Sequence, residues 1–427
     1  MLKTQTRYSL TDKESFIAKA LHWAHQFEHL AYYAHNDIPY PHHGFRHMLA
    51  VGAKALLLPE EKEDRFEALS AFHQGEWLFG HLGYDLKNEV EDLKSENPDR
   101  LGFPEMAFFK ADHLLIFEGD TVEIKSGDSS LFQTIEDFTY LPSSSQFGTI
   151  QGSMSKQEYL KTAQRLRDHI EEGDCYEINY CQEFHGRIDH ADPIQTFLKL
   201  SEISPKPFAC FQKWRNQYIL CASPERYLQK SGNRLISQPI KGTRPRGLTA
   251  AEDTQLCHEL RHDEKELAEN MMIVDLVRND LARVSEIGSV GVKELFGIYS
   301  FRQVHQMIST VGSILRPAFD FVDALECTFP MGSMTGAPKI RVMQLIEQYE
   351  NTKRGPFSGA AGYINPDGDF DFNVLIRSLF LNTSTNTYSF QVGSAITYDA
   401  IPEKEYEECL LKAKAIFEVL ADSTNDR

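Results

Sequence analysis

Apolar and polar positions repeat along the chain with two periods, one typical of helices and one typical of strands. Helical spacing predicts one helix over Phe16–Ala31 and another that begins after Ser155 and ends at Gly173. Ser155 and Glu158 form the S-x-x-E pattern of a capping box, in which both residues satisfy backbone N–H groups at a helix start. Because glycine is common just past a helix end, both boundaries of the second helix are predicted.

Runs rich in aromatic and β-branched residues predict strands in the middle and last thirds of the chain. The middle runs are Tyr176–Phe184, Phe208–Trp214, Tyr218–Ala222 and Arg234–Ile240. The turn sequences NPDGD and NTSTN predict antiparallel pairing among three later runs. These are Ala360–Ile364, Phe370–Leu381 and Tyr388–Val392.

The segment Gly75–Leu93 begins with a strand pattern and ends with a helical one, and Lys125–Gly152 has the composition of a connection. Further helices are predicted from Thr249 toward Val284, from Pro338, and over Glu403–Leu420. This order indicates a two-lobed α+β fold with antiparallel sheets in the interior and helices outside. We expect residues 1–150 to contribute to a β-sandwich scaffold and residues 151–427 to form the functional domain.

The composition is that of an ordinary globular protein of 427 residues, with 41% hydrophobic and 25% charged residues. Its formal net charge of −18 argues against a nucleic-acid partner, because phosphate binding requires a basic surface. An anionic substrate would need lysines, arginines or a metal ion gathered locally. The sequence shows neither a membrane-length apolar stretch nor the apolar segment of a signal peptide. We therefore expect a cytoplasmic protein without membrane contact.

Cysteines and clustered histidines give little sign of a metal site. The seven cysteines are scattered without a C-x-x-C pattern, which predicts reduced thiols and no zinc site. His42, His43 and His47 lack the acidic or thiol neighbours of a ligand set, so we expect them at the surface.

The segment QPIKGTRPRG places Lys241 in a predicted turn, with Arg244 and Arg246 close behind it. Positive neighbours disfavour the ammonium form, so we expect the pKa of Lys241 to be lowered and its neutral amine to act as a nucleophile. An exposed lysine in a basic loop is the alternative that these ten residues leave open.

The last predicted helix carries Glu405, Glu408 and Lys412 at spacings of three and four, which puts all three on one face. Such a stripe is typical of a solvated, salt-bridged surface. It also suits a magnesium site beside an anion contact, because magnesium takes hard oxygen ligands and often only one or two protein carboxylates. Both interpretations remain open from the pattern alone.

Two charged residues lie in strongly apolar patterns. Glu269 requires a cation or hydrogen-bond donors there, and it could pair with Arg278 or Arg261 or face Glu408 across a metal ion. Arg377, in the run FNVLIRSLF, requires an anion. That anion is either a protein carboxylate or the carboxylate of a substrate, which a guanidinium binds with two hydrogen bonds.

Three weaker signals complete the set. The glycine-punctuated loop FPMGSMTGAPK opens a helix, and its backbone N–H groups and Thr335 could hold an anion. Glu225, in SPERY, follows a predicted strand and is placed either as a general acid or as a surface residue. His305 is flanked by apolar residues, as an ordinary core histidine would be.

Seven segments between Ser223 and Cys409 resemble, in order, the motifs of the chorismate-utilising enzyme family. They are SPERY, QPIKGTRPRG, AENMMIVDLVRNDLARV, VHQMIST, GSMTGAPK, IRSL and EYEEC. A weaker similarity extends back through EEGDCYEINYCQEF to GEWLFGHLGYDLKNE, so the resemblance covers most of the chain. Lys241 is typical of the para-aminobenzoate branch, which leads towards folate. In the anthranilate and isochorismate branches this position is normally alanine.

The resemblance implies amination of chorismate by a chorismate-binding catalytic domain. Lys241 would attack ring C2, Glu225 would protonate the departing C4 hydroxyl, and ammonia would then attack C4 and expel the lysine. Magnesium held by Glu269 and Glu408, with Glu405 nearby, would bind the ring carboxylate. Substrate contacts are implied for His305, Thr335, Tyr363, Arg377, Gly393 and Lys412.

The chain departs from the family pattern at two positions. Ala395 follows Gly393 where relatives have small residues and glycines in series, and Glu177 stands where relatives carry glutamine or, in isochorismate-forming members, lysine. No amidotransferase segment is evident, so we expect a separate glutamine amidotransferase subunit to supply ammonia. The anthranilate-forming reaction is the nearest alternative function. A non-catalytic homologue that serves as a binding subunit is the alternative from another class.

Overall fold

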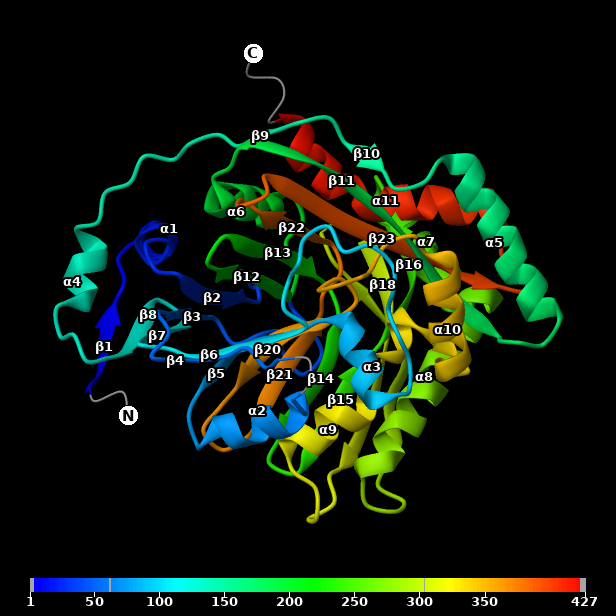
Figure 1. Ribbon diagram of the computed structural model, residues 1–427, viewed down its shortest axis with the longest axis horizontal. Helices are drawn as coiled ribbons and strands as arrows, with labels where there is room; N and C mark the ends of the chain where they lie inside the picture. Colours follow the sequence, from blue (N-terminus) through cyan, green and yellow to red (C-terminus); the bar gives the residue numbers. More distant parts are fainter. Residues whose placement is uncertain (1–3, 61–62, 303, 423–427) are drawn as a thin grey trace.

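The computed structural model describes residues 4–60, 63–302 and 304–422. Two antiparallel sheets form the interior, with helices around them (Figure 1). The larger sheet has 13 strands in the order β1-β8-β7-β3-β2-β12-β13-β22-β23-β11-β10, and β9 and β19 also pair with β11. The smaller sheet has 10 strands in the order β16-β18-β15-β14-β21-β20-β5-β6-β4, with β17 beside β18. The expected α+β class is confirmed.

The larger sheet draws strands from the whole chain. They are β1 (Thr4–Ser9), β2 (His29–Ala34), β3 (Met48–Val51), β7 (His113–Glu118), β8 (Thr121–Ser126), β9 (Gln146–Phe147), β10 (Gln151–Gly152), β11 (Glu177–His190), β12 (Phe208–Trp214), β13 (Gln217–Ser223), β19 (Gly336–Ala337), β22 (Ser378–Asn382) and β23 (Thr387–Thr397).

The smaller sheet likewise joins early and late segments. Its strands are β4 (Ala55–Leu57), β5 (Leu78–Leu82), β6 (Met106–Lys110), β14 (Arg226–Ser231), β15 (Arg234–Gln238), β16 (Ile240–Pro245), β17 (Gly291–Ser300), β18 (Val304–Ile314), β20 (Ala360–Ile364) and β21 (Phe370–Val374). Each sheet therefore combines strands from both sides of residue 150: β1, β8, β7, β3 and β2 lie next to one another in the larger sheet, and β5, β6 and β4 do so in the smaller one.

The helices are α1 (Lys13–Ala24), α2 (Arg65–His73), α3 (Lys87–Val90), α4 (Leu131–Glu136), α5 (Lys156–Glu171), α6 (Pro193–Ile203), α7 (Ala250–His262), α8 (Glu264–Val284), α9 (Phe321–Thr328), α10 (Lys339–Tyr349) and α11 (Pro402–Asp422), with short 3-10 turns η1 (Tyr84–Leu86) and η2 (Gly332–Met334). None of the helices within these residues is long and apolar enough to cross a membrane.

Two hydrophobic cores separate the layers. One contains side chains from both sheets and therefore lies between them. The other packs the outer face of the larger sheet against α1, α5, α6, α10 and α11. Polar contacts also tie the sheets together, because Tyr33 Oη donates to the Gly362 carbonyl at 2.5 Å and Gln212 Nε2 donates to the Gly80 carbonyl at 2.8 Å. Helices α7 and α8 pack on strands β16 and β18 at the edge of the smaller sheet.

Several predicted elements match closely. The capping box of Ser155 and Glu158 is present with both hydrogen bonds, at the start of α5. All four middle strands and the antiparallel pairing of β20 with β21 also occur as predicted. These elements carry strong local signals in caps, turns and alternation.

Several local predictions were wrong. The helix predicted over Phe16–Ala31 ends at Ala24, and the chain turns into β2. The long helix after Thr249 is two helices, because Asp263 has an extended backbone and caps α8 by accepting a hydrogen bond from the Glu266 N–H. Pro338 is the N-cap of α10 rather than its first helical residue. The Lys125–Gly152 connection contains the short helix α4.

Candidate active site

Lys241 lies on an edge strand and not in the predicted turn. Pairing of β16 with β18 shifts register between Ile240↔Ile308 and Thr243↔Gln306, so Lys241 and Gly242 together oppose one residue of β18. This is a β-bulge, and Gly242 supplies the positive φ of 97° that it contains. Bulges commonly redirect a side chain next to a functional site.

The Lys241 ammonium is surrounded by carboxylates. Its Nζ donates to Glu177 Oε1 at 2.6 Å, and only 11% of the side chain is exposed. Burial alone would lower the pKa of Lys241, but the charges of Glu177 and Glu269 outweigh burial and raise it. The prediction of a lowered pKa was therefore wrong.

Neutralisation of the two nearby arginines explains this error. Arg244 forms ion pairs with Asp263 and with Glu266, the latter at 3.2 Å. Arg246 binds Asp253 at 2.7 Å. Each guanidinium thus has its own carboxylate partners, and the uncompensated charge near Lys241 is negative.

Helices α8 and α11 bring the candidate magnesium ligands towards one another. Lys265 of α8 links them, because its Nζ lies 3.0 Å from Glu405 Oε1 and 3.5 Å from Glu269 Oε1. Burial raises the pKa of Glu269 to about 7, whereas Lys412 lowers the pKa of Glu408 to about 2. Glu269 thus pairs with Lys265 rather than with the arginines considered from the sequence.

The donor set fits a hard divalent cation. Glu269 Oε1 and Glu177 Oε2 are buried oxygens without a hydrogen-bond partner in the described chain. Oxygens of this kind retain capacity for a cation, and carboxylates are the ligands that magnesium takes. The Lys265 ammonium already provides positive charge between two of the glutamates.

Glu266 belongs to this group and was missed from the sequence. It lies one turn before Glu269 on α8, and burial together with the charge of Glu408 raises its pKa. The i, i+3 spacing of Glu266 and Glu269 was the available signal, since such residues share a helix face.

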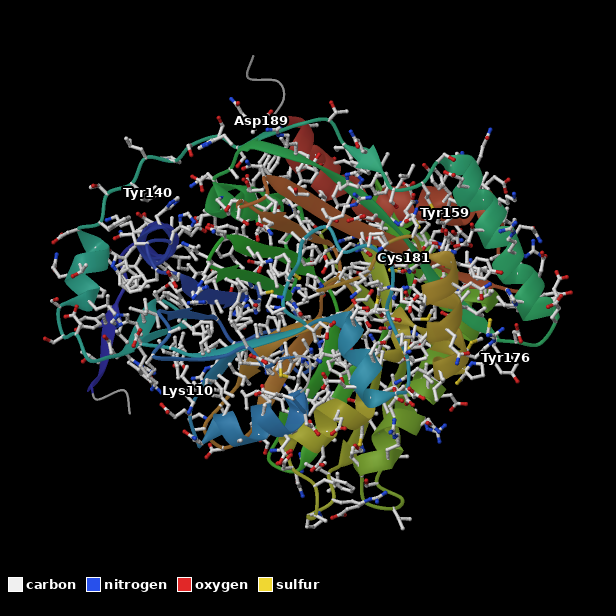
Figure 2. All side chains as sticks on the ribbon, viewed as in Figure 1. Lys110, Tyr140, Tyr159, Tyr176, Cys181 and Asp189 are labelled. Carbon is white, nitrogen blue, oxygen red and sulfur yellow. The ribbon has the colours of Figure 1, made fainter. Side chains whose placement is uncertain are left out.

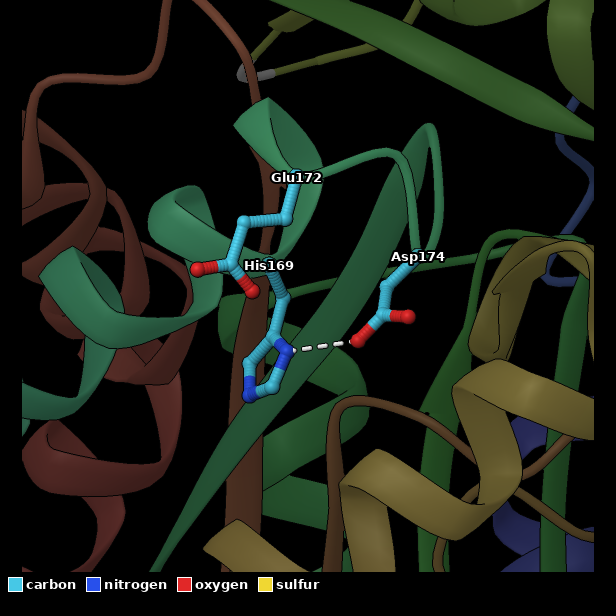
Figure 3. Close-up of side chains that lie close together, drawn as sticks. All are labelled: His169, Glu172 and Asp174. Carbon is cyan, nitrogen blue, oxygen red and sulfur yellow. Dashed lines mark hydrogen bonds and ion pairs between the residues drawn. The ribbon is translucent and has the colours of Figure 1, made fainter.

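A more compact cluster of ligand-type side chains lies elsewhere. Within the described residues, His169, Glu172 and Asp174 form the one group whose ligand atoms all lie within 4.8 Å (Figure 3). Its histidine and aspartate already have protein partners: His169 Nδ1 contacts Asp174 at 2.7 Å, and His169 Nε2 contacts Tyr349 Oη at 2.8 Å. Arg341 also binds Asp174 at 2.7 Å. We assign no metal site there.

Glu225 occupies the two-residue connection between β13 and β14, at a strand end as predicted. The residue is 4% exposed. Burial raises the pKa of its carboxyl to about 7, opposed by a hydrogen bond from Ser333 and by the charges of Lys241 and Lys412. A carboxyl with this pKa retains a proton near neutrality and can donate it.

Arg377 is a cation that forms no ion pair with a carboxylate of the described residues. It lies between β21 and β22 with a φ of 53°, rather than within a strand as expected. Its Nη1 donates to the Lys412 carbonyl at 2.9 Å, and no ion pair to a described carboxylate is formed. Burial lowers the pKa of Arg377 to about 10, which leaves it charged near neutrality.

Lys412 and Gly393 lie beside Arg377. Lys412 Nζ is 2.6 Å from Glu408 Oε1 and donates to the Gly393 carbonyl at 2.9 Å. Gly393 pairs with Cys181, labelled in Figure 2, and a Cβ on Gly393 would come within 2.3 Å of the Cys181 sulfur. Only glycine fits at this point of β23.

The other three candidates have different surroundings. Thr335 precedes the strand that pairs with Glu177, but its hydroxyl donates to the Gly332 carbonyl at 3.2 Å. Tyr363 Oη accepts from the Arg46 N–H at 3.0 Å, among aromatic residues of the N-terminal part. His305 contacts Asp253, Cys257 and Ser300. The described contacts of Tyr363 and His305 do not join them to Lys241.

Comparison with known proteins places the chain in a family. The family model described as chorismate binding enzyme matches residues 18–418. The chain therefore belongs to the chorismate-binding enzyme family, as its motifs predicted.

Named relatives fall into two groups. Aminodeoxychorismate synthase component 1 of Escherichia coli is 34% identical over 354 residues, which cover 80% of this chain and 76% of that protein. Anthranilate synthase component 1 of Thermus thermophilus is 32% identical over 372 residues, which cover 84% and 79%. A probable aminodeoxychorismate synthase of rice is 35% identical, but its match spans 82% of this chain and only 44% of the rice protein.

The structure resembles that of anthranilate synthase component I from Streptococcus pneumoniae. The TM-score is 0.77 with 28% sequence identity, and the match covers 87% of this chain and 92% of that one. Sequence identity and fold thus establish the family but do not separate its two aminating branches.

Proposed function

We propose that this chain acts as an aminodeoxychorismate synthase component I, converting chorismate and ammonia to 4-amino-4-deoxychorismate through a covalent adduct on Lys241. The observation that supports this most strongly is the 2.6 Å contact between Lys241 Nζ and Glu177 Oε1. It supplies the amine with a proton acceptor, which its raised pKa requires.

The first half-reaction forms the adduct. Lys241 transfers a proton to Glu177, and the resulting amine attacks ring C2. Both ring double bonds shift, the bond from C4 to its hydroxyl breaks, and Glu225 protonates the departing group to give water. One N–C bond forms, one C–O bond breaks, and no oxidation is involved.

The second half-reaction releases the product. Ammonia attacks C4 and gives a proton to Glu225, which was left ionised by the first step. Both double bonds shift back, the bond between Lys241 Nζ and C2 breaks, and the leaving amine recovers the proton held by Glu177. Both acids are thereby returned to their starting states, so the balance is chorismate plus ammonia to product plus water.

Cationic side chains offer places for the substrate carboxylates. Arg377 has no carboxylate partner among the described residues, so an anionic substrate can occupy its free N–H groups. Lys412 lies beside it. Magnesium would be held by Glu269 and Glu408, with Glu405 and Glu266 nearby, and when bound it would neutralise a substrate carboxylate.

A separate glutamine amidotransferase subunit would supply ammonia. The Escherichia coli relative is itself named as a component. With ammonium salts the purified chain should therefore turn over chorismate, and with glutamine alone it should not. Robust glutamine-dependent turnover by the isolated chain would contradict this part of the proposal.

Anthranilate formation is the second candidate, because relatives with that name are similarly close. The two activities give different products from the same mixture. Chorismate, a magnesium salt and an ammonium salt should yield 4-amino-4-deoxychorismate by mass analysis. Anthranilate and pyruvate as the main products would contradict the proposed function and support the second candidate.

A further inference from the structure

A thiol, an imidazole and a carboxylate lie in a row outside the candidate active site. Cys257 Sγ of α7 is 3.1 Å from His305 Nδ1 of β18, and His305 Nε2 is 2.9 Å from Asp253 Oδ1 of α7. This order is the arrangement in which a base activates a nucleophile while a third group orients the base.

Asp253 determines which ring nitrogen of a neutral His305 carries the proton, and so leaves the other nitrogen free to accept one from the thiol. Arg246 binds both Asp253 oxygens, at 2.8 and 2.7 Å, and the Gly247 N–H donates to Oδ1 at 2.8 Å. Arg246 therefore holds the pKa of Asp253 well below its usual range, so the carboxylate is ionised and accepts from Nε2–H. Nδ1 of a neutral His305 is then left as the proton acceptor on the side of Cys257.

A reactive thiol must be accessible to its reagent, and Cys257 is more exposed than the histidine beside it. His305 is 0% exposed, whereas Cys257 is partly exposed and Ser300 beside it is exposed. Ser300 Oγ is also 2.8 Å from His305 Nδ1 and 4.0 Å from Cys257 Sγ. A small reagent can therefore approach the sulfur from solvent while the base remains protected.

The other cysteines lack this combination. Five of the seven are buried, and only Cys257 and Cys327 are partly exposed. Burial raises the pKa of the Cys327 thiol, and no described histidine contacts its sulfur. Cys327 is therefore an internal reference for an unactivated thiol in the same molecule.

We propose that Cys257 is a nucleophilic modification site that reacts with hydroperoxides and soft carbon electrophiles, with His305 accepting the thiol proton. With a hydroperoxide, the sulfur attacks the terminal oxygen, an S–O bond forms and the O–O bond breaks. The leaving oxygen takes the proton from His305, so Cys257 is oxidised to a sulfenic acid and the peroxide is reduced to water or an alcohol. With iodoacetamide, an S–C bond forms and iodide leaves.

The first experiment measures the alkylation rates of Cys257 and Cys327 in one sample of the reduced whole chain. Limiting iodoacetamide is added near neutral pH, and peptides are quantified by mass spectrometry over time. Because the thiolate is the reactive form, Cys257 should react roughly tenfold or more faster than Cys327. Equal rates at the two positions would overturn the proposal.

Two variants then test the role of the imidazole. His305→Gln should slow Cys257 to the rate of Cys327 and leave Cys327 unchanged, whereas Ser300→Ala, which retains the base, should keep the fast rate. Fast alkylation of Cys257 in a folded His305→Gln variant would overturn the assignment of His305. If that variant does not fold, the ratio of the Cys257 and Cys327 alkylation rates in the unaltered chain still decides whether Cys257 is the more reactive thiol.

Hydrogen peroxide followed by dimedone tests the oxidation directly. Dimedone should label Cys257 and not Cys327 in the unaltered chain. Equal labelling of both cysteines, or labelling of Cys327 alone, would contradict the proposed chemistry.

Discussion

Two clusters of buried charge in this protein differ in how completely their hydrogen-bonding capacity is used. Arg354 and Glu350 form a two-fold ion pair with contacts of 2.6 and 2.9 Å, and Arg354 also donates to the carbonyls of Met334 and Asn179. The other Glu350 partner is the Cys181 N–H at 2.9 Å. This cluster has little capacity left for a ligand.

In the cluster around Lys241, by contrast, part of the hydrogen-bonding capacity is unused. Oxygens of Glu177 and Glu269 lack hydrogen-bond partners, and Arg377 has no carboxylate among the described residues. Buried polar groups without partners are costly to keep in a structure that makes no use of them. Under the proposed function, the first cluster holds the fold together and the second is available for a substrate and a cation.

The largest effect should follow loss of the nucleophile. Lys241→Ala should lower formation of 4-amino-4-deoxychorismate by about a thousandfold or more, because a covalent route loses its attacking group. Chorismate binding in the presence of magnesium should persist. Lys230→Ala, which removes a lysine paired with Asp369 at 3.0 Å away from these carboxylates, should leave the rate unchanged. Product formation by Lys241→Ala at the unaltered rate would show that Lys241 is not the nucleophile.

For the stability of the fold, the cluster of Arg354 and Glu350 should matter more than the cluster around Lys241. Arg354→Met should lower the free energy of unfolding by about 3–5 kcal/mol, because it leaves the buried Glu350 carboxylate uncompensated. Arg377→Met should change it by less than about 1 kcal/mol while weakening chorismate binding, since no protein anion loses its partner. Urea unfolding of both variants checks this contrast, and equal losses of stability would remove the distinction between the two clusters.

Metal dependence should follow the glutamates of α11. Chelation should abolish amination, and added magnesium should restore it. Glu408→Gln should raise the magnesium concentration for half-maximal rate roughly 10- to 100-fold, because a ligand oxygen with full charge is lost. Glu407→Gln is the matched control, since Glu407 is an exposed neighbour whose side chain makes no contact with the cluster in the described part of the chain. An unchanged magnesium requirement in Glu408→Gln would contradict the ligand assignment.

The pH profile should show the smallest effect. The pKa of Glu225 is raised to about 7, so its carboxyl holds the proton needed by the leaving group below that pH and loses it above. The maximal rate should therefore fall as pH rises past about 7, approaching a tenfold loss per pH unit. Glu225→Gln should remove this limb. If the rate of the Glu225→Gln variant still falls above about pH 7, that decrease would have to come from the titration of another group.

Local signals in the sequence predicted much of the fold. The capping box of Ser155 and Glu158, the strand-end position of Glu225 and the common face of Glu408 and Lys412 each depend on residues close in the chain. The helix expected beyond Ala24 failed because the following residues pair with distant strands as β2. Pairing across the sheet overrides local periodicity in such cases.

The candidate site was less predictable because its electrostatics depend on distant partners. The pKa of Lys241 is set by Glu177 of β11 and Glu269 of α8, whereas the arginines beside it in sequence are neutralised elsewhere. Lys265 illustrates the same point, since its link to Glu405 joins residues 140 positions apart. Sequence motifs singled out these residues, but only the fold shows which charges face one another.

The most direct test of the central claim is the mass of the chain quenched during incubation with chorismate and magnesium in the absence of ammonia. Peptide mapping should find Lys241 carrying chorismate less one water, and addition of ammonium before the quench should remove this modification. The Lys241→Ala variant should carry none. An unmodified Lys241 peptide in a preparation that forms 4-amino-4-deoxychorismate once ammonium is added would contradict covalent catalysis at this residue.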